Sequence, residues 1–173
     1  DLDKTSIEYV YGGGNAAAVP AYDVTILGSY IIHYVFGGGN GKSTSTFTNP
    51  GANIGTYHNG ATPYGSGKAV TKLVGCHAHY VFGGSNTKGN VRGGTSILMP
   101  DKSLYPAPEY DCCAVRDIQQ IYGAGNEAEQ DGSVTLILGC VHNMKNVYGG
   151  ARKANVKGGI DLVVTSGSFE GVF

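Results

Sequence analysis

Residues Ile7–Asn15 read IEYVYGGGN, and this phrase returns along the chain with small changes. Its form is an apolar residue, two variable residues, Val or Ile, an aromatic residue and a glycine-rich turn. The later copies are IHYVFGGGN from Ile32, AHYVFGGSN from Ala78, IQQIYGAGN from Ile118, MKNVYGGAR from Met144 and the short FEGVF over Phe169–Phe173. The phrase recurs about every 25 residues, with two intervals lengthened to about 46 and 40, and such a period is typical of solenoids and propellers.

A second short segment follows the phrase and alternates apolar with polar residues, as a half-buried strand does. It reads YDVTI over Tyr22–Ile26 and TSILM over Thr95–Met99, and VTLIL and IDLVV occupy the same place in later copies. Each unit of about 25 residues therefore holds two or three short strands joined by glycine corners, and the glycines of the turn can adopt positive φ. Such a unit cannot bury its own apolar face and has to stack on copies of itself.

Stacking predicts an all-β fold, a single-stranded parallel β-helix (β-solenoid) of about five to six rungs that spans residues 1–173 as one domain. Repeated positions should then form columns along the axis. The aliphatic column is Val10, Val35, Val81, Ile121, Val147 and Val172, and the aromatic column is Tyr11, Phe36, Phe82, Tyr122, Tyr148 and Phe173. The sequence does not decide whether the aromatic rings face inward or outward. A β-propeller is the rival architecture, but about 25 residues are too few for a four-stranded blade.

One further column lies in the turns, at Asn15, Asn40, Asn86 and Asn126, and Arg152 interrupts it. Asparagine suits tight turns, and stacked asparagine side chains form amide ladders. We therefore interpret this column as structural.

Two insertions lengthen the units, near residues 41–68 and 100–117, and their Ser, Thr, Asn, Gly and Pro content predicts surface loops. Both are expected to project from the stack. Aromatic side chains in these loops are the candidate binding residues, either for sugars or for a protein partner: Tyr57, His58, Tyr64, Tyr105 and Tyr110. The alternative is that they only cover the flank of the stack.

The four cysteines, Cys76, Cys112, Cys113 and Cys140, fall near the same corner of successive units. Adjacent units bring such positions within disulfide distance, and a bridge would imply an oxidising compartment. Buried free thiols are the equal alternative, because sequence does not fix pairing.

Composition excludes several classes of protein. The 29 glycines come with only six prolines and no Gly-X-Y period, which argues against collagen, and 41% hydrophobic residues oppose disorder. A net charge of −1 without a basic run argues against a nucleic-acid partner. No apolar stretch of about 18 residues is present, so no membrane insertion is predicted for this segment.

No catalytic residue, metal site or cofactor is predicted. Cys76, His77, His79 and His33 offer metal-ligating side chains, but His33 and His79 share a column with Glu8, Gln119, Lys145 and Glu170, which is typical of a solvent-facing row. The closest carboxylates, Glu127, Glu129 and Asp131, fit a solvated turn better than a catalytic pair.

The VFGGGN and VYGGGN phrases, with the V-x-G-G and T-x-I segments that follow, resemble the glycine-rich repeats of large bacterial adhesin-like surface proteins of the parallel β-helix type. The resemblance implies a right-handed helix at the cell surface, an extracellular, non-catalytic module for cell adhesion with host or microbial glycans or surface proteins as partners. The alternative is a β-helix carbohydrate-active enzyme, a polysaccharide lyase or glycoside hydrolase.

The last phrase stops at Phe173 without a polar cap. We therefore expect a segment of a longer repeat protein, or end-to-end self-association.

Overall fold

The computed structural model describes residues 6–27, 31–42, 51–57, 59–75, 77–99, 117–139 and 141–173. Throughout these ranges the regular secondary structure is all β-strand. Since the described residues contain no helix, none of them forms a helical segment that could cross a bilayer.

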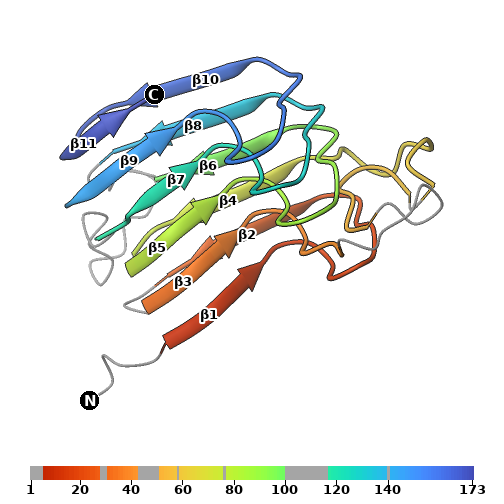
Figure 1. The fold of residues 1–173 in the computed structure, drawn as a ribbon, viewed down its shortest axis with the longest axis horizontal. Helices are drawn as coiled ribbons and strands as arrows, with labels where there is room; N and C mark the ends of the chain where they lie inside the picture. Colours follow the sequence, from red (N-terminus) through yellow and green to blue (C-terminus); the bar gives the residue numbers. More distant parts are fainter. Residues whose placement is uncertain are drawn as a thin grey trace.

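The strands form two parallel sheets. The six-stranded sheet contains β1 (Ser6–Tyr11), β3 (Ile31–Phe36), β5 (His77–Phe82), β7 (Gln120–Tyr122), β9 (Met144–Tyr148) and β11 (Phe169–Val172). The five-stranded sheet contains β2 (Tyr22–Ile26), β4 (Ala69–Leu73), β6 (Thr95–Leu98), β8 (Val134–Leu138) and β10 (Ile160–Val164). The chain alternates between the sheets, so each repeat unit from the first to the fifth supplies one strand to each (Figure 1).

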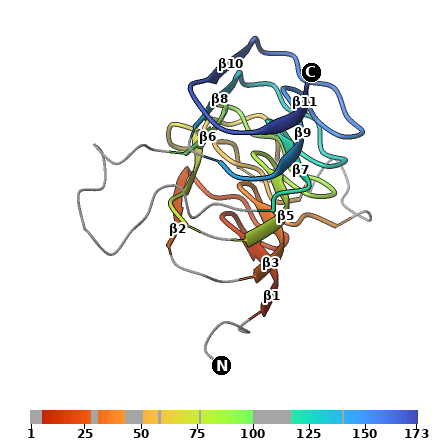
Figure 2. The same ribbon diagram turned by 90° about the vertical axis from the view of Figure 1, so that its left-hand side faces the viewer.

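Strand pairing follows the sequence repeat. Val10 pairs with Val35, Val35 with Val81 and Val81 with Ile121, and the same column continues through Val147 to Val172. The units consequently rise in chain order from the N-terminus to the C-terminus (Figure 2). Isolated parallel bridges join Val19 to Ile54 and Ile54 to Val91, so neighbouring units also pair at the bend between the two sheets.

The main core lies between the sheets. Alternation along a strand sends every second side chain inward, as in β8, where Val134, Leu136 and Leu138 are buried. They join Val35, Val81, Ile121 and Val147 of the other sheet in one apolar cluster. Each such side chain contributes about 1.5–3 kcal/mol on burial, and neighbouring units bury one another.

The aromatic column lies outside this core. Val35 belongs to the main cluster, whereas Phe36, Phe82 and Tyr122 form a separate buried cluster. Adjacent residues of a strand point to opposite faces, so the rings lie on the outer face of the six-stranded sheet. Phe82 is nevertheless only 1% exposed, because the rings of the neighbouring units cover it.

The glycines of the phrase do not use the positive φ that is open to glycine. None of them has a positive φ; the positive-φ glycines of the described chain lie elsewhere, as at Gly89 and Gly94. The phrase needs glycine because the units approach too closely for a side chain. A Cβ on Gly37 would lie 2.5 Å from the carbonyl oxygen of Gly83, and one on Gly83 would lie 2.2 Å from that of Gly123.

The first insertion is only partly a projecting loop. Ile54 is fully buried and packs with Ala69 and Val91, so residues 51–55 belong to the stack. A hairpin then leaves the stack: Thr56 pairs antiparallel with Pro63, and Asn59 accepts hydrogen bonds from the backbone of Ala61 and Thr62. The second insertion, between residues 100 and 116, falls outside the described residues.

Candidate functional site: a polar groove beside a tyrosine hairpin

The aromatic column forms a continuous stack of rings. Centroid separations from Tyr11 through Phe36, Phe82, Tyr122 and Tyr148 to Phe173 are 5.1, 4.8, 5.0, 4.8 and 5.2 Å, with the ring planes within 14° of parallel. A second stack, which the sequence analysis missed, joins Tyr9, Tyr34 and Tyr80 at 5.2 Å each. Rings inside a stack use both faces on each other, so these columns are structural and offer sugars few ring faces.

The asparagine column is a ladder of amide hydrogen bonds. The side-chain nitrogen of Asn40 donates to the oxygen of Asn15 across 3.0 Å, Asn86 donates to Asn40 across 3.0 Å and Asn126 to Asn86 across 2.9 Å. Arg152, which was expected to interrupt the column, extends it: its Nη1 donates to the Asn126 oxygen across 3.5 Å. The turns of the first five units are thereby joined on one side of the molecule.

Two of the candidate binding tyrosines come together on the hairpin. The Tyr57 and Tyr64 rings stack with centroids 4.3 Å apart, and Tyr57 is 42% exposed. The guanidinium of Arg92 donates to the carbonyl oxygens of Gly55 and Gly65 at the base of the hairpin, which holds its two ends together. His58, Tyr105 and Tyr110, and the cysteines Cys76, Cys112, Cys113 and Cys140, lie outside the described residues.

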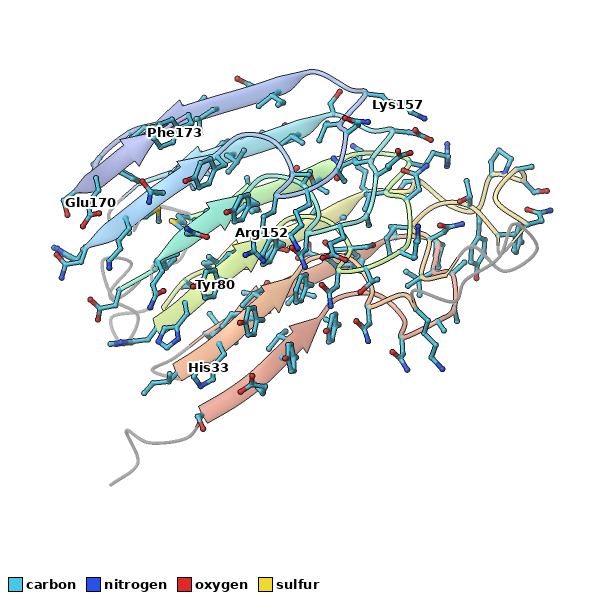
Figure 3. The ribbon with its side chains drawn as sticks, viewed as in Figure 1. His33, Tyr80, Arg152, Lys157, Glu170 and Phe173 are labelled. Carbon is cyan, nitrogen blue, oxygen red and sulfur yellow. The ribbon has the colours of Figure 1, made fainter. Side chains whose placement is uncertain are left out.

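A groove of about 570 Å³ opens next to the ladder, over the turns of the third, fourth and fifth units. Its small residues occupy matching positions: Glu127 N donates to Asn86 O and Lys153 N to Asn126 O, so the residues that follow, Ala128 and Ala154, also lie in register. Polar side chains surround them, namely Asn53, Lys88, Asn90, Glu127, Glu129, Arg152, Lys153 and Asn155. Figure 3 shows Arg152 on the same side of the molecule as the ring stack.

The groove touches the hairpin through one residue. Asn53 lines the groove, and its side-chain nitrogen donates to the carbonyl oxygen of Tyr57 across 3.4 Å. Its side-chain oxygen accepts from Asn90 N across 2.9 Å. Asn53 therefore connects the groove to the hairpin that carries the tyrosine pair, and we treat the two together as the candidate site.

Of the three carboxylates considered from the sequence, two line the groove and Asp131 does not. Glu127 and Glu129 line the groove, and Glu127 lies 2.9 Å from Lys153 Nζ. Asp131 lies 2.7 Å from Lys157 Nζ. Hydrogen bonds from Lys157 and then Asn90 hold the pKa of the Asp131 carboxyl below its usual range.

The histidine row does not assemble a metal site within the described ranges, where no three His, Cys, Asp or Glu side chains converge. His33 and His79 contact edge to face with ring centroids 4.9 Å apart, and His33 Nε2 lies 3.9 Å from Glu8. His77 instead faces Asp117, 3.5 Å away. A smaller hollow of about 410 Å³ lies at the end of this row, beside His79, Lys145 and Glu170.

Sequence reasoning missed Lys88, Arg152 and Lys153 as groove residues. Counting onward from the asparagine column would have found them, because Arg152 occupies the column, Lys153 follows Arg152 by one residue and Lys88 follows Asn86 by two. No family model, curated protein or solved structure matches the chain.

Proposed function

We propose that the chain is a right-handed, single-stranded parallel β-helix whose role is to present a binding surface. Three features support the β-helix class: the chain alternates between two parallel sheets, every pairing between strands of a sheet joins consecutive units, and isolated parallel bridges mark a third side. Handedness follows from the resemblance to adhesin-like repeats. A crossover between parallel strands of one sheet is also right-handed in nearly all proteins.

The proposed activity is non-catalytic adhesion at a cell surface, with a glycan or a surface protein as ligand. The observation that carries it is the groove, lined by polar side chains from four units and connected through Asn53 to the hairpin on which the exposed Tyr57 ring stacks on Tyr64. Aromatic rings beside convergent polar groups are common in binding sites. The groove stands on the stacked turns, which hold it in a fixed shape without a ligand.

A glycan array combined with pull-down from bacterial and host cell surfaces tests this function. We expect captured ligands to be lost by the double variant Tyr57→Ala, Arg152→Asn and retained by Lys145→Gln, which changes an exposed lysine outside the groove. The proposal is contradicted if neither a glycan nor a surface protein is captured by the folded chain.

A carbohydrate-active enzyme is the second candidate, because Glu127 and Glu129 both line the groove. Glu127 is exposed and paired with Lys153, whereas a carboxyl group that acts as a general acid is usually desolvated. Assays for new reducing ends and for unsaturated products from neutral and acidic polysaccharides decide between the two. Turnover abolished by Glu127→Gln or Glu129→Gln would establish the enzyme.

A further inference from the structure

We propose that the groove binds an acidic oligosaccharide, one whose sugars carry carboxylates, and that Lys88 and Arg152 are its anion-binding residues. The proposal rests on the proposed binding function and specifies its ligand class.

The charges in the groove are unevenly paired. Lys153 is neutralised by Glu127 at 2.9 Å. Lys88 and Arg152 have no ion pair within the described ranges. The guanidinium of Arg152 interacts with two neutral groups, the side-chain amide of Asn126 and the phenol of Tyr122. Glu129 acts on a different cation, Lys157. The pKa of Lys157 is raised chiefly by its hydrogen bond to Asp131, and the negative charge of Glu129 raises it further. Two cations thus remain available to an anionic ligand.

The shape of the groove fits an extended, hydroxyl-rich chain. Its base carries Gly89, Ala128 and Ala154, so it is hollow across three units, and Asn155 offers an amide beside it. A volume of about 570 Å³ lies within the range of small-ligand sites, which is about 300–1,000 Å³. A guanidinium matches a carboxylate with two parallel hydrogen bonds, which an ammonium does not, so Arg152 favours a carboxylate.

Other ligand classes fit less well. Protein interfaces depend on buried apolar and aromatic anchors, and the groove contributes only alanines as apolar side chains. A nucleic acid requires a run of cations along its phosphates, and the groove offers two unpaired ones beside two carboxylates. Tyr57 on the neighbouring hairpin supplies an exposed ring that a sugar can stack on.

Calorimetric titration of the full chain tests the proposal with four groups of probes of equal length: oligogalacturonate, oligoglucuronate, a sulfated oligosaccharide and the neutral reduced oligomer. Arg152→Asn is the decisive variant, because asparagine, as in the four preceding turns, keeps a donor for the Asn126 oxygen while the guanidinium and its charge are removed. We expect Arg152→Asn and Lys88→Gln each to weaken uronate binding by about 10- to 100-fold, as the loss of a charged hydrogen bond does. Glu129→Gln should strengthen it, and Lys145→Gln should leave it unchanged.

Thermal unfolding of each variant shows whether it is folded. The proposal is overturned if uronates do not bind, if the neutral or sulfated oligomer binds as tightly, or if Arg152→Asn and Lys88→Gln bind like the unchanged chain. In each of these cases a neutral glycan or a surface protein captured in the array and pull-down experiments would leave the adhesive function standing.

Discussion

Arg152 donates to the side-chain oxygen of Asn126 across 3.5 Å, in the position that asparagine occupies in the four preceding turns. The same arginine lines the groove. One residue therefore ends the amide ladder and also brings a charge to the candidate site. The ladder holds the turns in register, and the turns shape the groove.

The ladder predicts a difference between its middle and its end. Asn86→Ala removes a donor to Asn40 and an acceptor for Asn126, so we expect a loss of about 1–3 kcal/mol in the free energy of unfolding. Asn15→Ala removes one exposed bond and should cost less than about 1 kcal/mol. Denaturant unfolding measures both. Equal losses would contradict the predicted difference between the middle and the end of the ladder, and two negligible losses would show that the ladder does not stabilise the stack.

The close approach of the units predicts that alanine is not tolerated at Gly83. Its Cβ would lie 2.2 Å from the backbone oxygen of Gly123, which cannot move without separating two units. We expect Gly83→Ala to lower the unfolding free energy by about 3 kcal/mol or more. Gly150→Ala is the matched control in the last complete turn, where nothing lies within 4 Å of the added atom. A Gly83→Ala protein as stable as Gly150→Ala would contradict the observed spacing.

The ring stack predicts a similar contrast between two phenylalanines. Phe82 is 1% exposed and stacked on both faces, whereas Phe173 is 71% exposed and contacts only Tyr148 in the stack. Phe82→Ala should cost about 3–5 kcal/mol of unfolding free energy, and Phe173→Ala less than about 1 kcal/mol. Thermal unfolding of the two variants measures both losses. If both unfolding temperatures shift only slightly, the outer rings do not stabilise the fold.

The Asp131–Lys157 pair predicts that the free energy of unfolding depends on pH. The pKa of the Asp131 carboxyl is lowered in the folded chain, so its contribution to stability is present above the unfolded value of about 3.9 and is lost as pH falls through the folded value. The stability difference between the unchanged chain and Lys157→Gln should therefore be constant from about pH 6 to 9 and shrink below about pH 4.

NMR titration of the Asp131 carboxyl tests the cause of this dependence. Its pKa should rise in Lys157→Gln and stay unchanged in Lys145→Gln, a control without an ion pair in the described part of the chain. An unmoved Asp131 pKa would rule out the hydrogen bond from Lys157 as the cause.

Much of the fold could be predicted because the repeat is local and explicit. A phrase such as YVFGGSN at Tyr80 fixes which residue of each unit pairs with which, and so gave the columns of Val81 and Phe82. The orientation of the rings required coordinates, since alternation could have been broken by a bulge. The reason for the phrase glycines was missed, because the short distance to the next unit cannot be read from a single copy of the phrase.

The candidate site was harder to predict for a physical reason. Lys88, Ala128 and Ala154 are similar in position but not in chemistry, so a search for repeated residue types passes over them. Ile54 was assigned to a loop because its surroundings are polar, although it is fully buried between Val19 and Val91. Both features depend on contacts between units.

The central claim is that consecutive units stack in register, and methyl NOEs measured on a Val, Ile and Leu methyl-labelled sample test it most directly. We predict cross-peaks from Val10 to Val35, from Val35 to Val81 and from Val81 to Ile121, and none from Val35 to Ile121, which lie two units apart. Absence of the Val35–Val81 and Val81–Ile121 cross-peaks in the folded protein would contradict the stack and the groove built on it.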